Sequence, residues 1–242
     1  PSIPRSLSFR LLGQRHGGVW LTLGLALTIG FGTRVALLVK SAEEVSWNVS
    51  LLAAFLWGGL FDLAAALWWA VPLAVLLAFL PARIFTRRWA RGLAHGALLA
   101  VVYFLLFGAV AEWVFWDEFG VRFNFIAVDY LVYTKEVIGN IRESYPMPAI
   151  YGGLFAVALL IYGLLARTGW VTRWLDAAKE PARRRWSRAA GWSLALVVLG
   201  AGLDQNYLPG FANNYNRELA KDGLWSLFAA YRSNQLEFDR FY

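Results

Sequence analysis

The sequence contains no cysteine, only two histidines and one methionine, and its charged residues amount to 16% of 242. Without cysteine there is no disulfide framework, no thiolate metal site and no cysteine nucleophile. With His16 and His95 as the whole supply of imidazole, a histidine-based zinc site is disfavoured. The chain also has no HExxH sequence, no phosphate-cradling glycine loop and no recognisable nucleophile–base pair. The usual sequence signatures of catalysis are therefore missing, and no catalytic residue is predicted.

Apolar residues, in contrast, are abundant. They make up 59% of the chain, whereas an ordinary soluble domain has roughly 45–50% apolar and about 25% charged residues. A soluble core of this length could not bury so much apolar surface. The composition therefore predicts an all-α integral membrane protein.

Five nearly uncharged stretches have about the 20 residues that a helix needs to cross the ~30 Å hydrocarbon core of a bilayer. The second stretch, Val45 to Ala82, is long enough for one tilted helix or for two spans. A cleaved signal peptide is the competing interpretation of the first stretch, which is long for such a segment and lacks a clean cleavage site. We predict five spans, at about residues 17–38, 50–80, 92–114, 147–166 and 187–204.

The distribution of basic residues predicts the orientation. Five crossings place fourteen Lys and Arg residues on the side of the N-terminus and eight on the other side. The positive-inside rule then gives a cytoplasmic N-terminus and an extracytoplasmic C-terminus. Two spans in the second stretch would instead distribute the basic segments over both sides of the membrane. The run Arg183 to Arg185 is interpreted as a topology determinant near anionic lipid. Nucleic-acid binding is not expected, because no nucleic-acid module accompanies the run.

Two regions on the outer side are too long to be turns. Residues 117–146 combine apolar residues at helical spacing with intervening charges, which predicts interfacial helices lying in the membrane plane. Residues 1–205 would form the transmembrane domain, and residues 206–242 an extracytoplasmic connector helix. We expect Asn213 or Asn214 to cap that helix, which would continue through Glu218, Leu219 and Trp225 to Tyr231.

Three charged residues fall inside or at the edge of predicted spans: Arg34, Asp62 and Glu112. A charge near the centre of a span costs about 2.5–3.5 kcal/mol on the insertion scale. Asp62 follows Gly58 and Gly59. It is an ion or proton site at a broken helix, one half of a structural pair with Arg34, or a protonated or solvated side chain. Gly92 and Gly96 form a GxxxG pattern that favours close helix packing, with His95 between them as a packing or interface residue.

The outer region carries the candidate lipid-binding residues. In a helix, Tyr133, Glu136 and Asn140 share one face, and Asn124 and Asp129 lie upstream in the same region. Phenol, carboxylate and amide groups at headgroup level suit recognition of a lipid glycerol or amine. The alternative is a solvated interfacial helix whose polar face meets only water.

Three segments carry a family resemblance: EFGVRFNFIAVDYLVYTKEVIGNIRESYP from Glu118 to Pro146, the tail from Asn213 to Tyr242, and FLWGGLFDLAAA from Phe55 to Ala66. They resemble, in turn, the outer loop, the segment before the catalytic domain and the second span of lipoteichoic acid synthase-like, sulfatase-type phosphoglycerol transferases. The resemblance implies a bacterial inner-membrane enzyme with five spans and a large extracytoplasmic catalytic domain.

The same resemblance implies a reaction, namely transfer of phosphoglycerol from phosphatidylglycerol to an acceptor. The threonine nucleophile and a divalent metal, usually manganese, would belong to the catalytic domain, which is absent from residues 1–242. We therefore expect this chain alone to be inactive, to carry no cofactor, and to present the lipid headgroup to its own C-terminal domain. Open alternatives are a phosphoethanolamine transferase and a non-catalytic anchor or transporter-like protein that uses Asp62.

Overall fold

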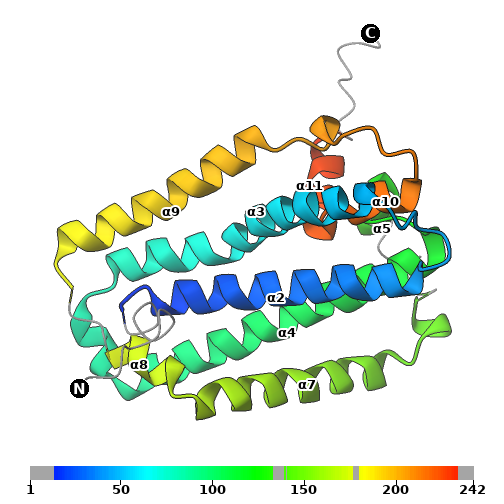
Figure 1. Ribbon diagram of the computed structural model, residues 1–242. Coiled ribbons are helices and arrows are strands. Elements are labelled where there is room, and N and C mark those ends of the chain that lie inside the picture. The colour runs from blue at the N-terminus through cyan, green and yellow to red at the C-terminus, as the bar shows by residue number, and fades with distance from the viewer. Residues whose placement is uncertain (1–13, 133–138, 140, 177–179, 234–242) are drawn as a thin grey trace, which may run out of the picture. The chain divides into compact units, whose positions relative to one another are not determined.

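The structure, a computed structural model, describes residues 14–132, 139, 141–176 and 180–233. These residues form helices and connecting turns, with no strand among them, as the composition predicts. Figure 1 shows the long helices that dominate the fold. They are α2 (Gly17–Lys40), α3 (Val49–Phe79), α4 (Arg88–Phe119), α7 (Met147–Arg167) and α9 (Ala182–Gly202).

Four of these helices, α2, α3, α4 and α7, are long and apolar enough to cross a membrane. Large apolar side chains are exposed along them, among them Leu56, Phe104 and Leu160, as expected of helices that face lipid. The fifth predicted span coincides with α9. Its first turns hold four arginines, so only Ala189–Gly202 is uncharged, and a crossing by α9 stays a prediction.

The second stretch of the sequence forms one helix. α3 runs without interruption through Gly58 and Gly59 and includes Pro72, so the prediction of one helix in this region is confirmed. At 1.5 Å per residue, its 31 residues extend well beyond the ~30 Å hydrocarbon core. A helix of this length fits a bilayer by tilting or by projecting beyond it.

The chain divides into two compact units. Unit 1 comprises residues 1–29, 66–106 and 154–202, and unit 2 comprises residues 30–65, 107–153 and 203–242. The helices α2, α3, α4 and α7 each contribute one part to each unit.

Unit 1 also contains the short helices η1 (Ala82–Thr86) and α8 (Trp170–Asp176), which pack against each other. Phe85 of η1 meets Trp174 of α8 edge to face, with ring centroids 6.3 Å apart. Arg15 precedes α2 and donates to the carbonyl of Leu77 from Nε at 2.9 Å and from Nη2 at 2.6 Å, and also to the carbonyl of Leu80. A guanidinium at this position satisfies carbonyls that the end of α3 leaves without partners.

Unit 2 contains α5 (Phe125–Val132), η2 (Gln205–Tyr207), α10 (Asn214–Leu219) and α11 (Gly223–Ser233). Its apolar core combines residues from α2, the connection between α2 and α3, α3, α4 and the C-terminal segment (residues 203–233): Leu37, Val45, Ala54, Trp116, Leu219 and Ala220. α5 packs against α11. Within residues 117–146, where interfacial helices are predicted, α5 is therefore a helix that the structure describes. Its orientation relative to a membrane stays a prediction.

The single connector helix predicted for the tail is wrong. Asn213 caps its start as expected, accepting from the backbone N–H of Asn216 at 3.0 Å. The helix then ends at Leu219, and a second helix begins at Gly223. The break occurs because Arg34 of α2 binds carbonyls at the end of α10 and Asp222 starts a new helix.

The prediction of close packing at Gly92 and Gly96 is also wrong for the described part of the chain. A Cβ atom added at either glycine would meet nothing within 4 Å. The pattern needs a partner helix at that face to favour close approach, and the described residues supply none. His95, between them, lies 2.9 Å from the hydroxyl of Tyr162 through its Nδ1, which fits the packing or interface role.

Candidate functional site

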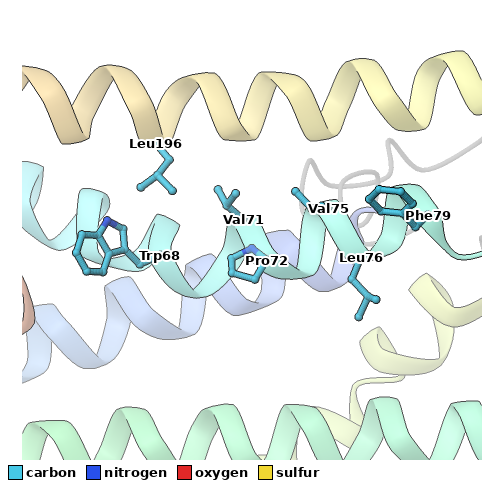
Figure 2. A pocket seen from close by; sticks show the side chains of 7 residues that line it. All are labelled: Trp68, Val71, Pro72, Val75, Leu76, Phe79 and Leu196. Atoms are coloured by element: carbon cyan, nitrogen blue, oxygen red, sulfur yellow. The ribbon is translucent and has the colours of Figure 1, made fainter.

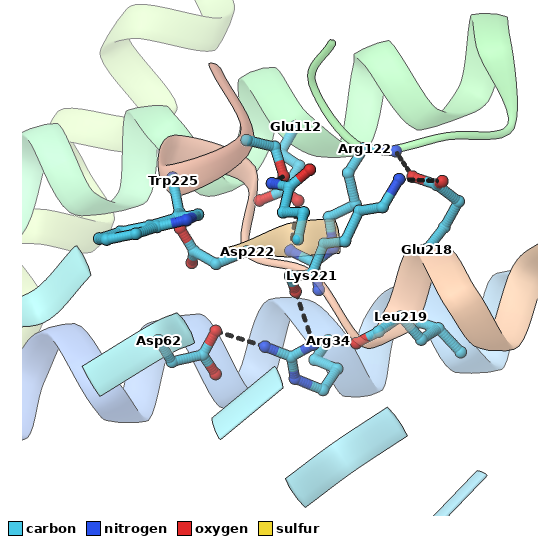
Figure 3. A network of polar contacts seen from close by, with 11 residues as sticks. Arg34, Asp62, Glu112, Arg122, Glu218, Leu219, Lys221, Asp222 and Trp225 are labelled. Carbon is cyan, nitrogen blue, oxygen red and sulfur yellow. Dashed lines mark hydrogen bonds and ion pairs between the residues drawn. The ribbon is translucent and has the colours of Figure 1, made fainter. Parts of the chain in front are cut away.

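A network of buried charged side chains lies inside unit 2 (Figure 3). It begins with Arg34 of α2 and Asp62 of α3, which form an ion pair between Nη2 and Oδ1. Arg34 is 0% exposed and Asp62 is 5% exposed. The structure thus brings together the two charges that the sequence analysis considered as a structural pair. Because apolar helices surround them, each side chain compensates the charge of the other.

Glycines leave the space for this pair. A Cβ atom at Gly58 would overlap the guanidinium of Arg34, and one at Gly30 would stand 3.4 Å from Cγ of Asp62. At Gly59, the neighbour of Gly58, an added Cβ atom would meet nothing within 4 Å. The first glycine of the Gly58–Gly59 pair therefore gives Arg34 a path across α3, and the second has no such role.

Arg34 also binds the C-terminal segment. Its Nη1 donates to the carbonyl of Leu219 and, at 2.8 Å, to the carbonyl of Lys221. These carbonyls lie at the end of α10, where backbone acceptors lack helical partners and where a cation is favoured by the helix dipole. One arginine thereby holds α2, α3 and the end of α10 together.

A second buried pair joins Arg122 to Glu112. α4 ends at Phe119, and Gly120 adopts a left-handed φ of +66°, a conformation that favours glycine at a helix end. The chain turns there, and the Arg122 guanidinium donates to Glu112 of α4. Arg122 is 1% exposed and Glu112 is 7% exposed.

The same residue links the network to α10 through its backbone. The N–H of Arg122 donates to Oε2 of Glu218 at 3.1 Å, and Glu218 also pairs with Lys221. Burial opposes the charge on Arg122, but the neighbouring carboxylates of Glu112 and Asp222 outweigh it and raise the pKa of Arg122 above its ordinary value. The guanidinium is therefore charged at every physiological pH.

Asp222 completes the set of carboxylates. Its Oδ1 accepts from the backbone N–H of Trp225 at 2.8 Å, so it is the N-cap of α11. Gly223 follows, and a Cβ atom there would stand 2.5 Å from Cδ of Glu112. The start of α11 thus lies directly against the side chain of Glu112. Four acids and three bases meet in the network, so its charges nearly balance: Asp62, Glu112, Glu218, Asp222, Arg34, Arg122 and Lys221.

Amide side chains attach the same segment to the connection between α2 and α3 and to the first turn of α3. Asn216 donates to the carbonyl of Ser46 at 2.9 Å and to Oγ of Ser50 at 2.8 Å, and accepts from the N–H of Ser46 at 3.1 Å. Asn213 donates to the carbonyl of Glu44 at 2.7 Å. Residues 213–222 are therefore held by ion pairs on one side and by neutral hydrogen bonds on the other.

The predicted lipid-binding residues are only partly described. Tyr133, Glu136 and Asn140 lie outside the described residues. Asn124 accepts from the backbone N–H of Ile126 at 2.9 Å, a contact that caps the start of α5. Asp129 is half-buried on α5, the helix that packs against α11.

Sequence reasoning missed Arg122, Glu218 and Asp222 as members of a buried network. It counted them only as charges of outer segments or as part of one long tail helix. A local signal existed for Asp222, because an Asp followed by Gly is a frequent start of a new helix or turn. No local signal pairs Arg122 with Glu112, since the left-handed turn at Gly120 brings them together.

The described residues do not suit the divalent metal that the family resemblance assigns to the catalytic domain. Among them, no three His, Asp or Glu side chains are grouped so as to hold a metal ion. The carboxylates of the network are instead bound to arginine, lysine or backbone N–H groups.

No protein-family model matches the sequence, and neither a curated protein nor a solved structure shows significant similarity to it.

Proposed function

We propose that the chain is the membrane domain of a phosphoglycerol-transferase-type enzyme, and that unit 2 presents the headgroup of phosphatidylglycerol to a sulfatase-like catalytic domain of the same protein. In this proposal the protein lies in a bacterial inner membrane, with five spans, a cytoplasmic N-terminus and an extracytoplasmic C-terminus. α9 is the fifth span, and the distribution of basic residues supports this orientation.

One observation carries the proposal. The described residues of the three segments with the family resemblance, within 55–66, 118–146 and 213–233, belong to one compact unit apart from Ala66. Within it, α5 of the second segment packs against α11 of the third, and Arg34 links its partner Asp62 in the first segment to the end of α10. A lipid-presenting platform requires this kind of joint folding, because headgroup and catalytic domain must keep a fixed separation.

The buried network supplies the rigidity. Its two arginine–carboxylate pairs are almost fully buried. Moving the C-terminal segment away would therefore leave several charged groups without their partners at once. Asp62 has a structural role in this account, as the partner of Arg34, and a transport role for Asp62 is not proposed.

The experiment uses the protein at its native length. We expect manganese-dependent turnover of fluorescent phosphatidylglycerol, and loss of turnover when Glu136→Gln or Asn140→Ala is introduced. Lys135→Gln is the matched control, because helical spacing places residue 135 on a different face. Turnover of phosphatidylethanolamine in its place would instead support the phosphoethanolamine transferase. Absence of turnover with either lipid would remove the proposal, as would unchanged rates in both variants.

A further inference from the structure

An apolar groove of about 620 Å³ lies in unit 1 between α3 and α9. It is lined by α3 residues between Trp68 and Phe79 and by Leu196 of α9. Figure 2 shows Leu196 pointing toward α3 and Val71 and Val75 pointing toward α9. The volume is within the ~300–1,000 Å³ usual for ligand sites, and the lining offers almost no polar group to a ligand.

One end of the groove is fixed by specific contacts. Phe79 meets Trp186 of α9 edge to face, with ring centroids 4.6 Å apart. Next to it, Nη1 of Arg185 donates to the carbonyl of Leu80 at 2.8 Å. The first turn of α9 is therefore held against the end of α3, and a tryptophan stands where the groove ends, as is common at the level of lipid headgroups.

Positive charge gathers at this same end. Arg183 and Arg184 are exposed and lie within one turn of Trp186. Unlike Arg185, which is bound to Leu80, they are available to a partner at the surface. α9 begins at Ala182, so the positive end of its helix dipole adds to the attraction for an anion.

We propose that this groove binds an acyl chain of an anionic phospholipid, with the lipid phosphate held by Arg183 and Arg184. The apolar lining matches a hydrocarbon chain, and the arginines complement a negative headgroup. The bilayer supplies this occupant directly, since the groove is formed by α3, a helix able to cross the membrane. A zwitterionic lipid fills the groove equally well but gains less from the two arginines.

This lipid site is independent of the proposed function. It is built only from residues of unit 1, whereas the transferase proposal rests on unit 2. We therefore choose phosphatidic acid as the probe, because it has the phosphate but lacks the glycerol headgroup that unit 2 would present. Failure of the transferase proposal would leave this test intact, and the reverse also holds.

The test measures phospholipid retained by the purified chain in native mass spectrometry, with phosphatidic acid and phosphatidylcholine offered in equal amounts. We expect wild type to prefer phosphatidic acid, and Arg183→Gln with Arg184→Gln to lower that preference about tenfold. The control pair Arg217→Gln with Arg232→Gln removes the same charge from exposed positions of unit 2 and should retain it.

A second pair of variants tests the groove. Leu196→Trp fills it and should lower the retention of both lipids, whereas Val198→Trp, at an exposed position of α9, should not. Gel filtration at the wild-type volume checks that each variant is folded. No preference in wild type, an equal loss in the control arginine pair, or full retention in Leu196→Trp would each overturn the proposal.

Discussion

Arg34 and Asp62 form an ion pair in which both side chains are almost completely excluded from solvent. The pair is asymmetric, because Arg34 has two further hydrogen bonds to the C-terminal segment, so the arginine organises more of unit 2 than its partner does.

This asymmetry predicts how substitution and exchange of the two residues affect stability. Asp62→Ala leaves Arg34 buried without its ion-pair partner and should lower the free energy of unfolding by about 3–5 kcal/mol. Arg34→Met should cost at least as much, since it leaves Asp62 unpaired and also strands the carbonyls of Leu219 and Lys221. Exchanging the two residues, Arg34→Asp with Asp62→Arg, should not restore stability, because those carbonyls need the donors at position 34. Chemical unfolding in detergent measures all three, and recovery in the exchanged variant would contradict this geometry.

Gly58 and Gly59 provide a matched comparison. Gly58→Ala should destabilise the protein markedly, because the new Cβ overlaps the Arg34 guanidinium. Gly59→Ala should be neutral or stabilising by up to about 1 kcal/mol, as expected for alanine in a helix. Thermal unfolding of the two variants in the same detergent tests the difference, and equal stabilities would show that Arg34 does not cross α3 at Gly58.

Gly223 should control the attachment of the C-terminal segment. A methyl group there would press on Glu112 and weaken its pairing with Arg122, so Gly223→Ala should make residues 203–233 more susceptible to limited proteolysis. Gly210→Ala is the control, since a Cβ at that position meets nothing within 4 Å. Cleavage at the same rate in both variants would show that Glu112 does not help to hold residues 203–233 in place.

His16 predicts a pH dependence of stability. Burial, and then the positive charges of Arg188 and Arg15, lower the pKa of His16 from 6.5 to about 4. The unfolded chain therefore binds more protons than the folded chain between these values, so the contribution is full above pH 6.5 and is lost as the pH falls toward 4. His16→Leu should weaken this dependence, which thermal unfolding across that range would measure. An unchanged profile would mean that His16 is not the responsible group.

Much of the fold follows from the sequence because long apolar runs leave few alternatives in a membrane. The helices α2, α3, α4 and α7 lie where uncharged stretches predict them. The Arg34–Asp62 pair is one of three interpretations that the sequence leaves open, and it is favoured because unpaired charges in spans are costly. The break after Leu219 has one local signal, the Asp222–Gly223 pair, but the contacts of Arg34 with the end of α10 come from a distant helix and leave no local signal.

The lipid-binding site, unlike the helices, stays a prediction. It rests on helical spacing of Tyr133, Glu136 and Asn140, which lie outside the described residues. Arg122 shows why such loop residues are hard to assign, because it resembles a solvated charge in the sequence yet is buried against Glu112. A single left-handed glycine decides that outcome.

The proposed function requires α9 to cross the membrane, so that the C-terminal segment lies on the side opposite the arginine-rich start of α9. Because the chain has no cysteine, Ala182→Cys and Ala212→Cys each introduce the only thiol, both at exposed positions. We predict that a membrane-impermeant maleimide labels Ala212→Cys in intact cells, and Ala182→Cys only after permeabilisation. Labelling of both from the same side would contradict the five-span account and the proposed function with it.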